Sequence, residues 1–173
     1  ATGSASVFAN ANLSNANLRG ANLTGASLSK TFLLNTDMTG AAIEKESLSE
    51  AFLCKTVMID GVISECELSG IDLHKIDLSD LDLRGIDLSN SDLRGTNLSN
   101  ANLNGANLSN TKLSKAILWK ANLKKANLTG ADLSVADLRK ANLSEANLDR
   151  ANLSRVFLIN TDITNAKINK EDL

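Results

Sequence analysis

The sequence has no proline and no tyrosine, one tryptophan, one histidine and two cysteines in 173 residues. Because proline removes a donor from a backbone hydrogen-bond ladder, its absence permits a ladder that continues along the whole chain. Aromatic residues make up only 3% of a chain that is 43% hydrophobic, so the core must consist of small and aliphatic side chains. Two cysteines say little about the redox compartment.

Long hydrophobic runs and a strong net charge are also missing. No apolar run reaches the roughly 18 residues of a transmembrane helix, and no secretory or transit pattern opens the chain. We therefore expect a cytoplasmic protein without a membrane partner. The net charge of -2 favours neither a nucleic-acid binder nor a strongly acidic chain, so we expect no direct binding of nucleic acid.

What the sequence has instead is a repeat of five residues. The stretch ANLSNANLRGANLTGASLSK, residues 11–30, places leucine at 13, 18, 23 and 28. This period fits neither a strand, which repeats every two residues, nor an α-helix, which repeats every 3.6. From Phe8 to Leu173 the same frame holds 34 positions, of which 27 are leucine and none is polar. We call this the central position.

The neighbours of the central position repeat as well. Two residues before it, 28 of 34 side chains are small, and the residue just before it is Asn or Asp at 21 of 33 sites. Residues two apart share one face of an extended segment, whereas Asn, Asp and Gly suit turns. Each repeat is therefore predicted to be a short extended edge followed by a bend. Successive repeats would coil around the central and small side chains, with backbone groups paired between coils.

The pattern A-[ND]-L-x-x, seen as ANLSN, ANLRG, IDLSN and ADLSV, resembles the pentapeptide repeat family. The resemblance covers residues 6–173, and leucine at the central position is more like the uncharacterised bacterial, notably cyanobacterial, members. It implies an all-β fold, the right-handed quadrilateral β-helix. With four repeats per coil, residues 20 apart would stack, and the chain would hold about eight coils.

The unbroken frame predicts a single pentapeptide-repeat β-helix domain over residues 1–173, with repeats from about 6 to 173 and no internal loop insertion. Two stretches are irregular. Residues 31–68 depart most from the consensus, and residues 71–88 carry Ile or Leu at the small position. We interpret both as local repacking of the core.

No group of residues resembles an active site, and we expect neither an enzyme nor a cofactor. The single histidine, His74, follows a central position and should face solvent. Cys54 should point outward and Cys66 inward, so the frame predicts no disulfide between them. Consecutive repeats point to different sides of the coil, so no metal site is expected from the following aspartates: Asp72, Asp77, Asp80, Asp82, Asp87 and Asp92.

Apolar residues at outward positions mark two candidate surfaces. The first candidate partner surface combines one column of apolar residues with basic neighbours, a combination typical of interface hot spots; its members are Val57, Ile59, Ile117, Trp119, Lys120, Arg139, Phe157 and Ile159. Lys140 lies beside it. The second candidate patch lies on a neighbouring face and consists of Phe32, Leu34, Phe52 and Cys54. Scattered exposed apolar side chains are the alternative explanation for both.

These observations favour a non-catalytic scaffold that binds a protein partner. The alternative is a DNA-mimic inhibitor of DNA gyrase, as in the quinolone-resistance members of the family. This sequence departs from those members in its leucine centres, its missing loops and the basic character of residues 100–173. The repeat also reaches Leu173, which leaves a homodimer through a terminal coil open.

Overall fold

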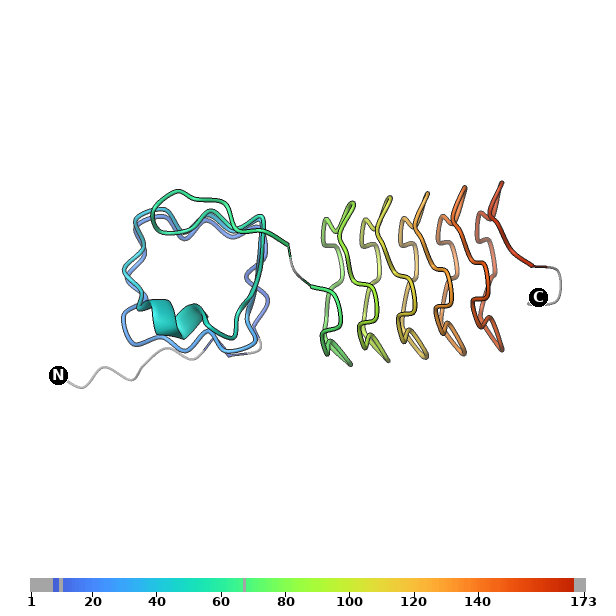
Figure 1. Cartoon of the computed structure of the whole chain (residues 1–173), viewed down its shortest axis with the longest axis horizontal. Helices are drawn as coiled ribbons and strands as arrows, with labels where there is room; N and C mark the ends of the chain where they lie inside the picture. Colours follow the sequence, from blue (N-terminus) through green and yellow to red (C-terminus); the bar gives the residue numbers. More distant parts are fainter. Residues whose placement is uncertain (1–7, 10, 67, 170–173) are drawn as a thin grey trace. The chain divides into compact units, whose positions relative to one another are not determined.

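The computed structural model describes residues 8, 9, 11–66 and 68–169. The chain divides into two compact units, Ala1–Glu67 and Leu68–Leu173. Each unit is built from the same kind of coil, as Figure 1 shows. The predicted terminal coil includes residues 170–173, which lie outside the described residues, so the homodimer stays a prediction.

Each coil has four sides of five residues, because every parallel bridge joins residues 20 apart, as in Asn102↔Asn122 and Asn122↔Asn142. The N–H of Leu103 donates to the carbonyl of Asn122 at 2.8 Å, and the N–H of Asn122 donates to Ala101 at 2.9 Å. The predicted right-handed quadrilateral β-helix and its register are therefore confirmed. The predicted number of coils stays a prediction.

Most sides pair through a single residue and are too short to form a full strand. The exceptions are β1, Phe32–Leu34, and β2, Phe52–Cys54, which pair in parallel with Phe32 opposite Phe52. One side of the first unit is replaced by a 3-10 helix, η1, Lys45–Leu48, which keeps the central residue Leu48 buried. Within the described ranges these are the only elements longer than a bridge.

The core is made of the central and small positions, as predicted. In the second unit the leucines at 103, 108, 113 and 118 and the alanines at 101, 106 and 121 are fully buried. Threonine at a small position is also buried, because its hydroxyl finds a partner one coil back. Thr96 Oγ1 donates to the carbonyl of Leu73 at 2.7 Å, and Thr36 Oγ1 donates to that of Leu13 at 2.8 Å. A polar side chain is therefore accepted in this core where a backbone carbonyl can receive its hydrogen bond.

At the regular corners the residue two after the centre has positive φ, and the described exceptions all lie between residues 45 and 65. The carbonyl of Leu103 accepts the N–H of Ala106 at 3.0 Å, with Gly105 at φ 69° between them. Most corners carry Asn, Lys or another residue in place of Gly. The Asn or Asp before the centre supports the turn, since its side-chain oxygen accepts the N–H two residues on, as in Asn127 and Thr129 at 3.2 Å.

The aspartate-rich first coil of the second unit forms the start of a side-chain ladder. Asn127 Nδ2 donates to Asn107 Oδ1 at 3.2 Å, and Asn107 Nδ2 donates to Asp87 Oδ1 at 3.0 Å. Asn97 donates to Asp77 in the same way at 3.0 Å. In this ladder each coil donates to the coil before it, so a residue in the first coil of the unit only has to accept a hydrogen bond. A carboxylate can do this. The ladder thus accounts for Asp77 and Asp87, and Asp72 and Asp82 contact His74 and Arg84 of their own repeats.

The coil is interrupted at residues 59–66, where the prediction of an unbroken frame is wrong. Val57 pairs in antiparallel fashion with Ile63, and the N–H of Met58 donates to the carbonyl of Val62 at 2.7 Å. The chain thus reverses through Gly61, which has φ +84°. Ile63, predicted to be a buried centre, is 63% exposed.

The reversal also explains why the prediction of two unpaired cysteines is wrong. Cys54 and Cys66 form a disulfide, with a Cα–Cα distance of 4.2 Å. Cys66 would lie on the inside of the wall if the coil continued. Because residues 62–64 run back along residues 56–58, Cys66 instead reaches the outer side of β2, to which Cys54 points.

Candidate interaction surface

One side of the second unit carries apolar side chains where other repeats carry polar ones. The residues before the centre form the column Asn97, Ile117, Asp137 and Phe157, joined by parallel bridges. Two residues on, the outward positions are Ser99, Trp119, Arg139 and Ile159. On this side, the last three of these four coils, counted along the chain, form a surface that we call the Trp119 wall. It consists of Ile117, Trp119, Asp137, Arg139, Phe157 and Ile159.

The apolar members of the Trp119 wall are open to solvent. Ile117 is 43%, Phe157 51% and Ile159 65% exposed. Their N–H groups are engaged in the ladder: that of Ile117 donates to Thr96 at 2.9 Å and that of Phe157 donates to Ala136 at 3.0 Å. The wall therefore presents these side chains on a backbone that the ladder holds in place.

Trp119 is partly buried and held against the wall by two lysines. Lys120 Nζ lies 4.2 Å from the centroid of the indole ring, and Lys140 Nζ lies 5.7 Å from it. Both distances are within the range of a cation–π interaction. The ring is thus fixed in place before any partner arrives.

An ion pair separates the two apolar rows of the wall. Arg139 Nη2 donates to Asp137 Oδ2 at 2.6 Å and Arg139 Nε donates to Asp137 Oδ1 at 2.8 Å. The Arg139 side chain lowers the pKa of Asp137, and Asp137 in turn raises the pKa of Arg139. The pair stays charged at neutral pH and offers a fixed donor and acceptor in the middle of the wall.

The six corners that bound the wall carry four bases, one valine and one asparagine, Asn160. Lys115, Val135 and Arg155 lie along one edge, and Lys120 and Lys140 lie along the other. Sequence reasoning missed Val135, which is exposed and has φ 61°. A β-branched residue at positive φ is a backbone outlier, and its place at a corner position in the frame was the signal available in the sequence.

Two residues of the predicted partner surface lie elsewhere. Val57 and Ile59 belong to the first unit, where Val57 pairs with Asp37 on one side and with Ile63 on the other. Ile59 packs partly buried against the core of that unit. The predicted column breaks here because the reversal at Gly61 replaces the ladder step that would lead from Val57 to Asp77.

The second candidate patch is not an exposed surface. Phe32, Leu34 and Cys54 are buried, and Phe52 is only partly exposed. The rings of Phe32 and Phe52 stack with their centroids 4.6 Å apart, and Cys54 is bonded to Cys66. These outward positions are apolar because they contact one another, so the prediction of a docking patch here is wrong.

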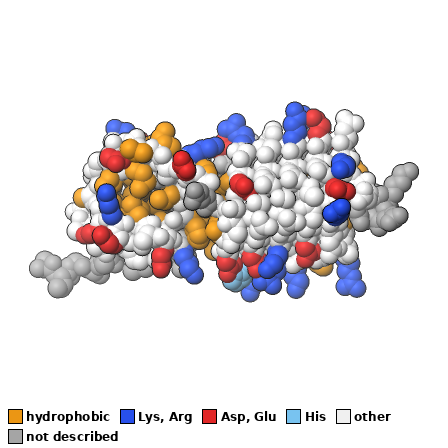
Figure 2. Space-filling model, viewed as in Figure 1, with side chains coloured by type: hydrophobic (Ala, Val, Ile, Leu, Met, Phe, Trp, Pro, Cys, Tyr) orange, Lys and Arg blue, Asp and Glu red, His pale blue; other side chains and the backbone are white. Residues whose placement is uncertain are grey.

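Other apolar side chains gather on the first unit (Figure 2). This unit also carries an open groove of about 360 Å³, lined by Lys45, Leu48, Ser49, Met58, Ile59, Asp60 and Val62. Val62 is among its most exposed large apolar residues. The groove has no cluster of charged or nucleophilic side chains that would define a ligand.

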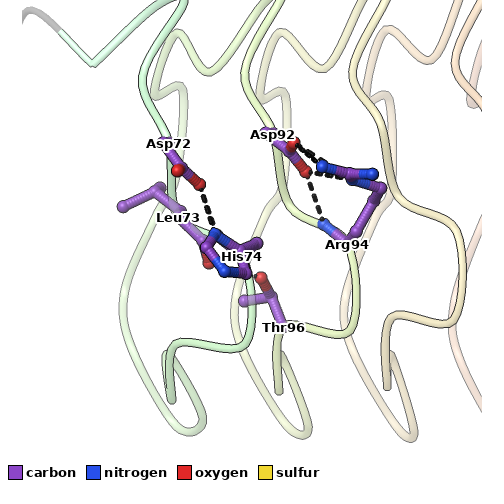
Figure 3. A network of polar contacts seen from close by, with 6 residues as sticks. All are labelled: Asp72, Leu73, His74, Asp92, Arg94 and Thr96. Carbon is purple, nitrogen blue, oxygen red and sulfur yellow. Dashed lines mark hydrogen bonds and ion pairs between the residues drawn. The ribbon is translucent and has the colours of Figure 1, made fainter.

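The polar contacts around His74 are those of surface pairs (Figure 3). His74 Nδ1 lies 2.7 Å from Asp72 Oδ1, and Arg94 Nη2 donates to Asp92 Oδ2 at 2.6 Å. Hydrogen bonds from the side chain and N–H of His74 lower the pKa of Asp72, and Arg94 lowers that of Asp92. Each pair joins residues of one repeat, and the hydroxyl of Thr96, which Figure 3 also draws, donates to the backbone carbonyl of Leu73.

Two kinds of site are not found among the residues that the structure describes. No group of three or more His, Cys, Asp or Glu side chains is arranged to hold a metal ion. No helix in the described ranges is long and apolar enough to cross a membrane.

Acidification is expected to destabilise the fold only below about pH 4. The Thr39 hydroxyl and N–H, followed by Arg19, lower the pKa of Asp37 from 3.8 to about 2, and similar bonds lower those of Asp77 and Asp87. Because these folded-state pKa values lie below the unfolded ones, the carboxylates stabilise the fold above pH 4, and their contribution is lost as the pH falls towards 2.

Thermal melting from pH 7 to pH 2 measures this effect. The melting temperature should be flat down to about pH 4.5 and then fall. The variant Asp37→Asn keeps a side-chain oxygen for the turn but removes one titrating group, so its melting temperature should fall less steeply at low pH. A decline that begins between pH 7 and pH 5 would contradict the carboxylate explanation.

Four five-residue sides per coil, parallel bridges at 20 residues and an aliphatic core define a solenoid repeat protein of the quadrilateral β-helix class. The family model described as pentapeptide repeats matches eight copies in this chain, at residues 6–41, 71–110, 82–119, 106–144 and 131–169. The chain therefore belongs to the pentapeptide repeat family. The unmatched stretch between 41 and 71 contains η1 and the reversal.

Solved structures of the family are similar to this chain. A pentapeptide repeat protein, Rfr23, from the cyanobacterium Cyanothece 51142 is 38% identical over 56% of this chain and 62% of its own, with a TM-score of 0.49. This chain thus spans less than two thirds of that relative. HetL from Nostoc sp. strain PCC 7120, involved in heterocyst differentiation regulation, is 26% identical over 94% of this chain and 82% of its own, with a TM-score of 0.46.

A more distant similarity is to QnrB1, a plasmid-mediated fluoroquinolone resistance protein. It is 21% identical over 97% of this chain and 86% of its own, with a TM-score of 0.36. A comparison of the sequence with curated proteins found no match.

Proposed function

We propose that this chain is a non-catalytic scaffold that binds a protein partner through the Trp119 wall. One observation carries the proposal: Ile117, Phe157 and Ile159 stay exposed at outward positions of a wall whose repeats pair with neighbouring coils. Exposed apolar side chains grouped on one face, with Trp and Arg among them, are typical of protein interfaces.

Rigidity supports the proposal. The central leucines beneath the wall, Leu118 and Leu138, are fully buried, and each side is tied to the coils before and after it. A surface that is already ordered loses little conformational entropy when it binds. The three exposed residues share one side of the solenoid, in the first and third of three successive coils, which distinguishes them from the single apolar side chains that are common on protein surfaces.

The alternative of a DNA-mimic gyrase inhibitor is less well supported. A DNA mimic needs a continuous negative surface. The segments 115–120, 135–140 and 155–160, which contain the wall and its corners, hold five bases and one acid. A supercoiling assay with micromolar protein tests this alternative separately, and inhibition of gyrase would favour it.

Affinity capture from a lysate of the source cell tests the scaffold proposal. The wild-type chain is compared with Trp119→Ser/Ile159→Ser and with the control Ser114→Ala/Ser134→Ala, which changes outward positions on the neighbouring side. We expect a protein retained by the wild type and the control to be lost by the first variant. If all three chains, shown by melting to be folded, retain the same proteins, the wall is not the binding surface.

A further inference from the structure

We propose that the partner of the Trp119 wall is an acidic polypeptide segment with apolar side chains. The inference rests on the proposed function and specifies the chemistry of the ligand. The apolar rows Ile117/Trp119 and Phe157/Ile159 would contact its apolar side chains, and the cationic corners would pair with its carboxylates.

Charge is the first argument. The corners of the wall carry Lys115, Lys120, Lys140 and Arg155, and the one acid of these segments, Asp137, is already paired with Arg139. Among the residues that the structure describes, none of those four bases forms an ion pair with a carboxylate. Like charges grouped around one face repel each other, and an acidic ligand relieves this repulsion and is steered towards the face.

Several other basic side chains of the second unit are paired with carboxylates. Arg84 and Arg94 donate to aspartates of their own repeats, and Lys124 and Lys125 lie 3.3 Å and 3.6 Å from Glu145. Lys167 lies 3.7 Å from Asp149. Lys75, Lys112 and Arg150 also form no ion pair within the described residues, so the four bases beside the wall differ in being grouped around one side of the coil.

Backbone strain at Val135 is the second, independent argument. Val135 has φ 61°, a conformation that disfavours β-branched residues, and it remains 37% exposed. The corresponding corners one coil away carry Lys115 and Arg155. Such strain is typical of functional positions. Contact with an apolar side chain of a ligand would bury Val135 and offset the strain.

The wall suits a polypeptide better than a membrane or a nucleic acid. Lys120 and Lys140 hold the Trp119 ring against the wall, so it does not project as a membrane anchor would. The Asp137–Arg139 pair lies between the apolar rows, where it can hydrogen-bond to a peptide backbone but would be costly to bury in lipid. Nucleic acid would place phosphates against Phe157 and Ile159, which offer them no donors.

Peptide selection tests the inference. A phage library of random twelve-residue peptides is selected on the full wild-type chain and counter-selected on Ile117→Ser/Ile159→Ser. Because Trp119 is the only tryptophan, its fluorescence then measures the affinity of each synthetic peptide at the wall itself. We expect the selected peptides to combine several Asp or Glu residues with bulky apolar ones and to lose affinity as salt rises.

Charge reversal provides the decisive comparison. In Lys120→Glu/Lys140→Glu the affinity for the selected peptides should fall about tenfold or more, while Lys112→Glu/Arg150→Glu, which reverses two charges away from the wall, should change it less than about twofold. The corner variants should remain folded, since Glu145 already occupies a corner with φ 61°. Melting curves verify this.

Each other outcome overturns a different part of the argument. Peptides that are neutral or basic but still need Ile117 and Ile159 would overturn the acidic ligand and leave the scaffold proposal intact. Equal affinity of all peptides for wild type and Ile117→Ser/Ile159→Ser would overturn both. A blue shift of Trp119 fluorescence with phosphatidylserine vesicles, or its quenching by duplex DNA at physiological salt, with no acidic peptide selected, would assign the wall to that ligand instead.

Discussion

Leu103→Asp is expected to unfold the second unit. Leu103 is fully buried among central leucines of its own coil and of the coils on either side. The substitution leaves a cavity and puts a carboxylate into an aliphatic core, at a cost of about 5 kcal/mol or more. That is comparable to the whole stability of a typical domain. Because each coil is paired with its neighbours, several coils should be lost together.

Trp119 fluorescence follows this unfolding, since the only tryptophan lies in the second unit. The matched control is Asn104→Asp, which introduces the same carboxylate one residue later, at an outward position. Its effect on melting should stay within about 0.5 kcal/mol. A Leu103→Asp chain that melts at the wild-type temperature would refute the solenoid core.

The regular coils could be predicted from the sequence because each column carries one physical requirement. Leucine recurs where the side chain points into the core, and Ala and Thr recur where only a small side chain fits there. Asn or Asp recurs where a turn needs a side-chain acceptor. A pattern that repeats more than thirty times averages out individual departures. The 20-residue register of Asn102, Asn122 and Asn142 was therefore predictable, given four repeats per coil.

The reversal at 59–66 was missed because its residues also fit the frame. Ile63 is apolar at a central position, and Gly61 and Cys66 are small at small positions. A competing local signal was nevertheless present: Asp60-Gly61 lies between apolar residues, and Gly at positive φ is typical of short hairpin loops. The chain follows the hairpin turn at this point instead of continuing the five-residue coil. Cys66 is therefore placed where it can bond to Cys54.

The composition of the Trp119 wall was partly predictable, because this wall lies in the coils that keep the regular 20-residue register. Ile117, Phe157 and Ile159 interrupt columns that are otherwise polar, so their exposure follows from the register. The ion pair of Asp137 with Arg139 could not be derived, because it depends on side-chain rotamers within one repeat. The corner position of Val135 does follow from the five-residue frame, although its residue type disfavours the positive φ found there.

Removing the disulfide is expected to destabilise the first unit and leave the second unchanged. Cys54 and Cys66 close a loop across 12 residues of sequence that contains the reversal at Gly61. In the chain-entropy description, a cross-link of this span restricts the unfolded chain and contributes about 3 kcal/mol. For a unit of this size, the loss corresponds to a fall in melting temperature of roughly 10–20 °C. The N–H of Lys55 and Ser64 should exchange faster as the antiparallel pairing opens.

The measurement is hydrogen exchange by mass spectrometry, with and without a dithiol reductant, on wild type and on Cys54→Ser/Cys66→Ser. Reduced wild type and the double serine variant should both show increased exchange over residues 52–66, while exchange around Leu103 and the fluorescence of Trp119 stay unchanged. The reductant should have no further effect on the serine variant, which controls for non-specific action. Equal protection of 52–66 in all samples would mean that the backbone bonds of the reversal hold it without the cross-link. Loss of protection in both units at once would show that their stabilities depend on each other, since the disulfide lies in the first unit alone.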